Sequence, residues 1–342
     1  MKKMFFALAA LVLAFTGCSQ EDEAIQTNEQ KAVKVVVNMD KPGFGTDARA
    51  ARDGWEGDEE VVVVLDNYFG AFVHLYYEGY SREWQASYYI YDGEEFDAIY
   101  DYKVSEFIGN LKTELGDNGN LKAIYLSSGE VYPENGNSTP ATRASIPEQD
   151  VTLLGNVPET LRIVSDAVEE GKGECIMTCE DGSFEISGNE EDGYVLALNI
   201  TMVPQVAQFT IRDLYIEDGY SVEYAGTITA YAGGTITPAG VELNPVGEPG
   251  YEYGAWVHDN EDGISIYASP WQVAPEGFDM EMLEDVGGLG YFGFTLYDAD
   301  NNQYYREFKE KNTLKNGGAV IFDGPYTKKD GELTAGAQLW EE

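Results

Sequence analysis

Apolar and polar residues alternate along most of the chain, and this pattern predicts a protein built mainly from β-strands. The segment Lys31 to Asn38 places Val33, Val35 and Val37 on one side, as expected of a strand with one buried face. A second strand at 60–66 is apolar from 61 to 65, so it is expected to be buried on both faces. Further strands are expected at 71–77, 84–91, 121–126, 151–154, 162–164, 174–179, 194–202, 205–211, 222–231, 264–268, 291–297, 303–308 and 319–322.

Helical spacing of apolar residues predicts one short helix, at residues 106–115. There Phe107, Ile108 and Leu111 recur at intervals of one and three residues before Gly116. A chain with so many strands and so little helical periodicity is typical of antiparallel β-sandwiches rather than of a parallel sheet covered by helices. The sequence therefore predicts an all-β fold with little helix.

Turns between the strands are indicated by Asp-Gly pairs, including Asp181-Gly182 and Asp192-Gly193. The clearest group of alternating runs begins just after the second of these pairs. We therefore expect two β-sandwich domains in tandem, an N-terminal domain over residues 31–191 and a C-terminal domain over residues 192–342.

The first residues have the layout of a secretory signal peptide. Two lysines precede an apolar run over residues 4–15, and Thr16-Gly17 lead into Cys18. The run is shorter than the roughly 18 apolar residues of a membrane-spanning helix, so cleavage is the better interpretation. The segment resembles a bacterial lipoprotein signal, which implies removal of residues 1–17 and a lipid on Cys18. The alternative is an ordinary signal peptide with an incidental cysteine.

The residues after Cys18 predict a tether. Residues 18–30 are polar and without periodicity, which is typical of a flexible stalk. The acidic residues at 21–23 resemble the signal that sends lipoproteins of the Bacteroidetes group to the outer face of the outer membrane. The expected location is therefore the cell surface, with the outer membrane as a partner through the lipid anchor.

Charge excludes one class of partner. The chain holds 61 acidic and 21 basic residues, for a formal net charge of −40, so phosphate backbones are repelled and nucleic acid is not expected to bind. The same charge disfavours direct adsorption to anionic lipid. Because 43% of the residues are apolar and 13% aromatic, packed cores are expected rather than disorder.

Cysteine and histidine patterns predict neither a metal site nor catalysis. Cys175 and Cys179 would lie roughly 13 Å apart in a strand, so they are either unpaired thiols or, if a turn intervenes, a local disulfide. Too few Cys or His ligands lie nearby for zinc. His74 and His258 lie among strand residues, and no nucleophile elbow, metal-binding helix or phosphate loop accompanies them. We expect no cofactor and no enzymatic activity.

A partial calcium-loop pattern occurs late in the chain. Asp298, Asp300 and Asn302 have the spacing of the first ligands, but Gln303 replaces the required Gly and Lys309 the final Glu. A hairpin turn is the preferred interpretation.

The order of segments resembles the fimbrillins of Bacteroidetes, which are subunits and accessory proteins of type V pili. The resemblance is carried by the lipoprotein signal, the early strand, an arginine-bearing loop, and Trp55-Glu56-Gly57-Asp58 before an apolar strand. It is carried further by the strand pair at 195–211 and by the run at 291–296 followed by Tyr304-Tyr305. The resemblance implies two transthyretin-like β-sandwich domains and a place in the fimbrium.

The resemblance also implies a mode of assembly. A surface protease would cut after Arg49 or Arg52, and the strand bearing Val33, Val35 and Val37 would leave its groove to a strand from the next subunit. A plain solvated loop is the alternative interpretation of the two arginines. The donor strand would be the alternating run Leu333, Ala335, Ala337 and Leu339. Other pilus subunits are then partners, and the role could be that of a stalk subunit, a tip adhesin or an anchor.

Aromatic residues suggest a second function. Rings exposed on strands can stack on sugars, so the alternative is a lipid-tethered surface glycan-binding protein, although strand packing accounts for most of the tyrosines. A host protein or glycan is then a candidate partner. The candidate rings are Tyr76, Tyr77, Tyr80, Trp84, Trp256 and Trp271.

Overall fold

The structure is a computed structural model in which strands dominate and the described residues contain one helix, α1 (Asp101–Leu115). It describes residues 33–44, 55, 57, 59–126, 131–133, 149–165, 173–212, 219–227, 231–245, 252–258, 263–268, 293–298, 303–307, 316–323, 327–329, 332–334 and 337–341. The prediction of an all-β fold with little helix is confirmed.

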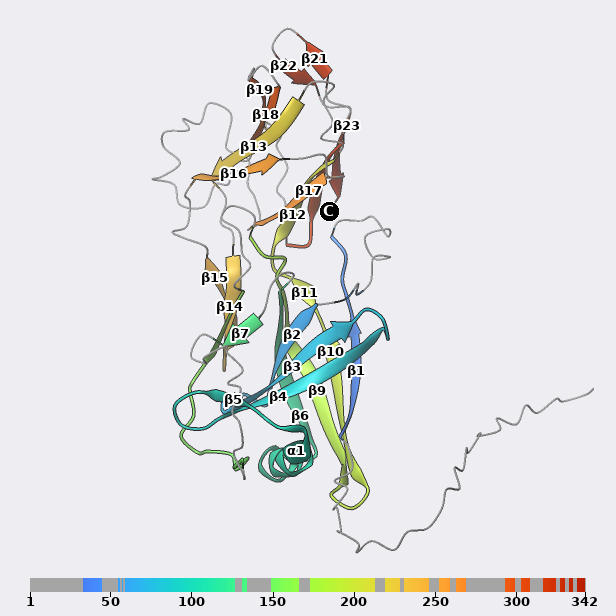
Figure 1. Cartoon of the computed structure of the whole chain (residues 1–342), viewed down its shortest axis with the longest axis vertical. Helices are drawn as coiled ribbons and strands as arrows, with labels where there is room; N and C mark the ends of the chain where they lie inside the picture. The colour runs from blue at the N-terminus through green and yellow to red at the C-terminus, as the bar shows by residue number, and fades with distance from the viewer. Residues whose placement is uncertain are drawn as a thin grey trace, which may run out of the picture.

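A curled nine-stranded sheet forms the main body (Figure 1). Its order is β1-β10-β9-β6-β2-β3-β4-β5, and β11 pairs with β9. The ladders are antiparallel except that between β1 and β10, which is parallel. The strands are β1 (Lys34–Asp40), β2 (Glu60–Leu65), β3 (Ala71–Glu78), β4 (Glu83–Tyr91), β5 (Phe96–Ala98), β6 (Asn118–Leu126), β9 (Met177–Asn189), β10 (Gly193–Thr201) and β11 (Val203–Pro204).

Both faces of this sheet are covered. On one face, Val61 and Val63 of β2 share a core with Phe107 and Leu111 of α1. On the other face, Val62 and its neighbours form a second core with a smaller sheet. Burial of β2 on both faces is therefore confirmed, and the predicted helix is confirmed with a start at Asp101 instead of residue 106.

The smaller sheet is built from distant parts of the sequence. Its order is β15-β14-β8-β7, with β7 (Val131–Pro133), β8 (Leu161–Ser165), β14 (Tyr231–Thr237) and β15 (Gly240–Pro245). Ile163 and Ile236 bury their side chains against Ile124 of β6. The β14–β15 hairpin thus follows every strand of the nine-stranded sheet in the sequence but packs back on that sheet.

Polar contacts hold the tip of this hairpin. The Lys122 ammonium donates hydrogen bonds to the carbonyl oxygens of Thr237 (2.9 Å) and Pro238 (2.7 Å). The backbone N–H of Val241 donates to Glu180 Oε1 at 3.3 Å. Gly233 has φ +156°, and a Cβ there would lie 2.0 Å from the Ile163 carbonyl oxygen, so β14 approaches β8 too closely for any side chain.

Three further sheets hold the remaining strands, and Figure 1 shows them beyond the end of the nine-stranded sheet that lies opposite α1. Their orders are β17-β12-β20-β23, β16-β13-β18-β19 and β21-β22, and β12 pairs with β20 in parallel. The strands are β12 (Ala207–Arg212), β13 (Gly219–Thr227), β16 (Glu252–His258), β17 (Gly263–Ala268), β18 (Gly293–Asp298), β19 (Gln303–Glu307), β20 (Ala319–Asp323), β21 (Thr327–Lys329), β22 (Glu332–Thr334) and β23 (Ala337–Glu341).

Two local predictions are wrong. Residues 151–154 form no strand, because Val151 is buried and its carbonyl oxygen accepts a hydrogen bond from Asn110 Nδ2 of α1 (2.9 Å) instead of a ladder bond. Asp181-Gly182 is not a turn but part of β9. A Cβ on Gly182 would lie 2.3 Å from Leu121 Cδ1, so glycine serves close cross-strand packing at an irregular point in the ladder.

The turn at Asp192-Gly193 is confirmed, but it does not separate two folds. Asn189 Oδ1 accepts the N–H groups of Glu191 (2.8 Å) and Asp192 (2.9 Å), which closes the β9–β10 hairpin. A boundary between residues 191 and 192 would divide two paired strands of one sheet. The nine-stranded sheet continues to β11.

Cys175 and Cys179 are buried thiols that are not joined in a disulfide. Burial raises the pKa of both thiols. We expect the chain with Cys18→Ser to be unreactive toward Ellman's reagent at pH 8 while folded, and to release about two thiol equivalents once unfolded in guanidinium.

The pH dependence of stability follows from the same burial. Because the folded pKa values lie above the unfolded value of about 8.5, the stabilisation is complete below that pH and is lost as the pH rises through the folded values. Rapid reaction of the folded chain with Ellman's reagent at pH 8 would contradict the burial of these two thiols.

Candidate functional site

The first strand occupies an edge of the nine-stranded sheet. Among the described strands, β1 forms a ladder with β10 alone, in register from Lys34 opposite Val195 to Asp40 opposite Thr201. The sheet curls so that β4 approaches β1 from its other side without pairing with it. Parallel pairing is slightly weaker per residue than antiparallel pairing, so this ladder holds β1 less strongly than an antiparallel ladder of the same length would.

The side chains of β1 alternate between the core and the solvent, as predicted. Val33, Val35 and Val37 are partly buried against the main core, whereas Val36 is 42% exposed. The inward series continues to Met39, which is 8% exposed. The core against which these residues pack includes Leu196, Leu198 and Ile200 of β10 and Trp84 and Ala86 of β4.

Lys41 extends this inward series by one more position and enters a group of three residues that we call the Lys41 cage, namely Trp55, Glu59 and Tyr125. The Lys41 ammonium forms an ion pair with Glu59 Oε1. It also lies 5.5 Å from the Trp55 ring centroid and 5.6 Å from that of Tyr125, within the range of cation–π attraction. The Tyr125 hydroxyl donates to Glu59 Oε1 at 3.4 Å.

Glu59 is only 7% exposed, so its carboxylate is largely removed from water. A buried carboxylate is costly unless it is paired and hydrogen-bonded, and the Lys41 ammonium supplies a charge of opposite sign. The cage therefore binds a cation at the end of β1.

Trp55 connects the cage to the backbone of β1. Its Nε1 donates to the Met39 carbonyl oxygen at 3.1 Å. Its ring meets Trp84 edge-on at 4.8 Å and Tyr125 at 5.5 Å, and lies 6.5 Å from Tyr77. Trp55, the first residue of the Trp-x-Gly-Asp segment, thus helps to hold the end of the first strand.

The predicted processing and lipidation residues lie outside the described residues. These are Cys18, Arg49 and Arg52. The described chain is nevertheless anchored on both sides of residues 45–54, because Phe44 is buried in the main core and Trp55 packs against it.

The predicted donor run is divided between two strands. Leu333 lies in β22 opposite Lys328, whereas Ala337 and Leu339 lie in β23 opposite Asp323 and Ile321. Ala335 lies outside the described residues. In the described part of its sheet, β23 is an edge strand that pairs with β20 alone.

Four of the six predicted sugar-stacking rings have described side chains, and these four fall into two groups. Tyr76 and Tyr80 are exposed, the latter at 99%. Tyr77 and Trp84 instead pack against each other and Trp55. The side chain of Trp256 and all of Trp271 lie outside the described part. One exposed pair was not foreseen: Tyr100 and Tyr102 stack at the start of α1, with their centroids 5.8 Å apart.

The two histidines lie in different strands. His74 lies in β3 opposite Val62, with its Nε2 3.2 Å from Glu60 Oε2. His258 lies in β16 opposite Ser221.

The partial calcium pattern begins at Asp298, the last residue of β18, and its residues Asp300 and Asn302 lie outside the described residues. β18 pairs with β19 in the antiparallel sense, as the preferred interpretation requires. Within the described part of the chain, no group of three or more metal-ligating side chains is present. No helix among the same residues is long and apolar enough to cross a membrane.

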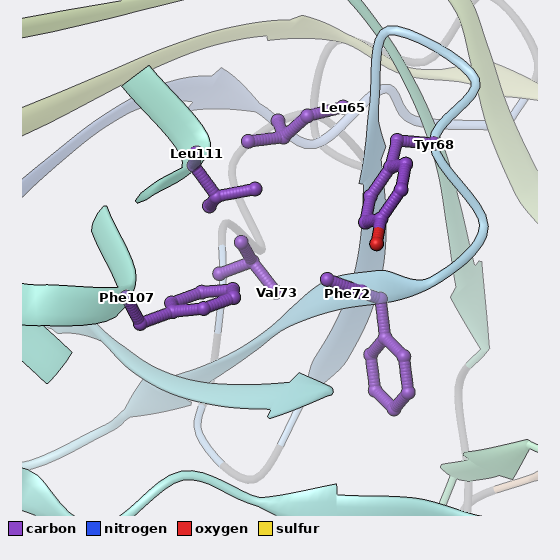
Figure 2. A pocket seen from close by; sticks show the side chains of 7 residues that line it. Leu65, Tyr68, Phe72, Val73, Phe107 and Leu111 are labelled. Atoms are coloured by element: carbon purple, nitrogen blue, oxygen red, sulfur yellow. The ribbon is translucent and has the colours of Figure 1, made fainter. Parts of the chain in front are cut away.

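A small internal space lies between α1 and the sheet, and Figure 2 shows Phe107 and Leu111 of the helix facing Val73 and Leu65. It has no room for a water molecule, so it is far smaller than the roughly 300 Å³ at which ligand pockets begin. Its other lining residues are Tyr68, Ala71 and Phe72, and the Tyr68 hydroxyl already donates to the Leu154 carbonyl oxygen at 3.0 Å. The space is part of the apolar core.

The sequence patterns do not single out Lys41, Glu59 and Tyr125. A signal for Lys41 exists, because it continues the odd-numbered inward series of β1, but Pro42 directly after it is typical of a loop. Glu59 and Tyr125 are 66 residues apart and belong to different segments, so only the fold brings them together.

Comparison with known proteins finds similarity in structure without similarity in sequence. No protein-family model matches the chain. No curated protein matches it by sequence. A candidate cell adhesion protein of Bacteroides uniformis aligns with 92% of this chain and 98% of its own, at a TM-score of 0.43 and 8% identity.

Two fimbrial proteins of Porphyromonas gingivalis are also similar. A C-terminally truncated tip protein aligns with 91% of this chain and all of its own, at a TM-score of 0.39 and 10% identity. An anchor protein aligns with 91% of this chain and 97% of its own, at a TM-score of 0.28 and 8% identity.

Proposed function

We infer that this chain is a cell-surface fimbrial subunit or adhesin that joins a neighbouring subunit by exchange of β1. In this proposal Cys18 carries a lipid that holds the precursor at the outer membrane, and cleavage after Arg49 or Arg52 separates β1 from the body. The neighbouring subunit then supplies the replacement strand.

The observation that carries the proposal is the position of β1. It is joined to the sheet by one parallel ladder, while Val35, Val37 and Met39 fill the core behind it. Departure of β1 would leave a row of N–H and C=O groups on β10 beside an apolar core. An added strand of alternating apolar residues would satisfy the backbone groups and the core together.

Treatment of the purified precursor with an arginine-specific protease tests the proposal. We expect a cut after Arg49 or Arg52, giving a folded body whose first residue is Ala50 or Asp53. The precursor with both Arg49→Lys and Arg52→Lys serves as the matched control and should stay intact in this segment. An intact wild-type chain, or cleavage at other arginines alone, would count against assembly by this route.

Binding of glycans by exposed rings has weaker support. Two of the candidate rings, Tyr77 and Trp84, are occupied by packing against Trp55. The exposed Tyr100–Tyr102 pair is the feature that favours it. A glycan array probed with wild type and with Tyr102→Ala separates the two functions, since a structural subunit needs no sugar.

A further inference from the structure

Along the sequence, Lys41 and the three residues of the Lys41 cage lie on opposite sides of the predicted cleavage segment. Lys41 precedes Arg49, whereas Trp55, Glu59 and Tyr125 follow Arg52. A cut at either arginine therefore leaves the cage with the body and allows Lys41 to leave with β1. The largely buried Glu59 carboxylate then loses the ammonium that contacts it.

We propose that the vacated β1 site accepts a strand carrying a lysine or arginine at its fifth inward position, and that its partner is therefore a different subunit and not a second copy of this chain. This inference rests on the proposed exchange of β1. The inward series of β1 is Val33, Val35, Val37, Met39 and Lys41, that is, four apolar residues followed by a cation. A replacement strand must match both parts, because alternate side chains provide the specificity of strand addition.

The C-terminal run of this chain matches the apolar part of the series but not its charge. When Leu333 takes the place of Val33 and Leu339 that of Met39, the fifth position is Glu341. A strand inserted in the opposite direction would place Gly331 there. The first arrangement brings a second carboxylate to Glu59, and the second brings no charge.

In the first arrangement, rejection of the chain's own C-terminal strand would be an electrostatic effect, whereas in the second no ammonium would replace that of Lys41. Two carboxylates in a largely buried site repel each other, and such repulsion suppresses wrong partners more than it strengthens the right one. The cage would thus prevent self-polymerisation, while a partner with a basic residue at the fifth position would restore the ion pair.

The test uses the full chain after cleavage by the arginine-specific protease and four fluorescent peptides in excess. Two span residues 31–43, as the natural sequence and with Lys41→Glu. The other two span residues 331–342, as the natural sequence and with Glu341→Lys. Incorporation into the body is measured by size-exclusion chromatography. We expect the natural 31–43 peptide to enter, and Lys41→Glu to reduce its incorporation at least tenfold. We also expect Glu341→Lys to increase incorporation of the 331–342 peptide at least tenfold.

A variant of the body distinguishes charge recognition from a general effect of peptide charge. In Glu59→Gln the carboxylate is replaced by an amide of similar shape, so the difference between the natural and the Lys41→Glu peptides should fall to less than threefold. Equal incorporation of the four peptides by the wild-type body would overturn this inference and leave strand exchange standing. Failure of even the natural 31–43 peptide to enter would overturn the proposed exchange, and this inference with it.

Discussion

Replacing Trp55 with alanine is expected to lower the free energy of unfolding by about 3–5 kcal/mol, the usual cost of truncating a packed tryptophan. The ring contacts Trp84 and Tyr125 edge-on, lies beside the Lys41 ammonium, and donates its Nε1 hydrogen to the Met39 carbonyl oxygen. Alanine would remove all these contacts and leave a space beside β1. Urea unfolding followed by far-UV circular dichroism measures the loss without depending on tryptophan fluorescence.

Tyr80→Ala is the matched control, because this ring is 99% exposed and its removal should change stability by less than about 0.5 kcal/mol. The Trp55→Ala protein should also release the β1 fragment faster than wild type after cleavage by the arginine-specific protease. A stability loss no larger than that of Tyr80→Ala would show that Trp55 does not hold the end of β1.

The second large effect is expected from Ile236→Asp in the β14–β15 hairpin, with a loss of more than about 4 kcal/mol. Ile236 is fully buried at 0% exposure in the core shared with Ile124 and Ile163. A carboxylate there would lose its hydration among apolar side chains. The hairpin should detach from the nine-stranded sheet, and thermal unfolding followed by circular dichroism would record the lower stability.

Ala239→Asp is the control for this change. It adds the same side chain three residues away, at the exposed tip of the hairpin, so stability should stay close to that of wild type. Limited proteolysis should cut Ile236→Asp within residues 228–250 at a protease concentration that leaves the control intact. Equal stability of the two variants would mean that the hairpin does not depend on this core.

Local patterns were sufficient where one element alone decided the outcome. The alternation of Val33, Val35 and Val37 predicted the inward face of β1, and the apolar run from 61 to 65 predicted a strand buried on both faces. The spacing of Phe107, Ile108 and Leu111 predicted α1. In each case the spacing of apolar residues within a single helix or strand is enough to predict its buried face.

Patterns failed where distant segments decided the outcome. Asp181-Gly182 has the composition of a turn, but a neighbouring strand needs a glycine there, so the pair continues β9. The turn at Asp192-Gly193 was correctly predicted, yet it closes a hairpin inside one sheet. No local pattern at 231–245 indicates that this hairpin returns to cover the first sheet.

By itself, the sequence determined the all-β class, the inward face of β1, the single predicted helix and the net charge of −40, because these depend on local period and on composition. The tertiary structure alone decided that β1 lies at a sheet edge and that Lys41 meets Glu59, Trp55 and Tyr125. The physical reason is that strand order and charge pairing arise between segments far apart in the chain. The fold places the Glu59 carboxylate where packing largely removes it from water, and there it pairs with the Lys41 ammonium.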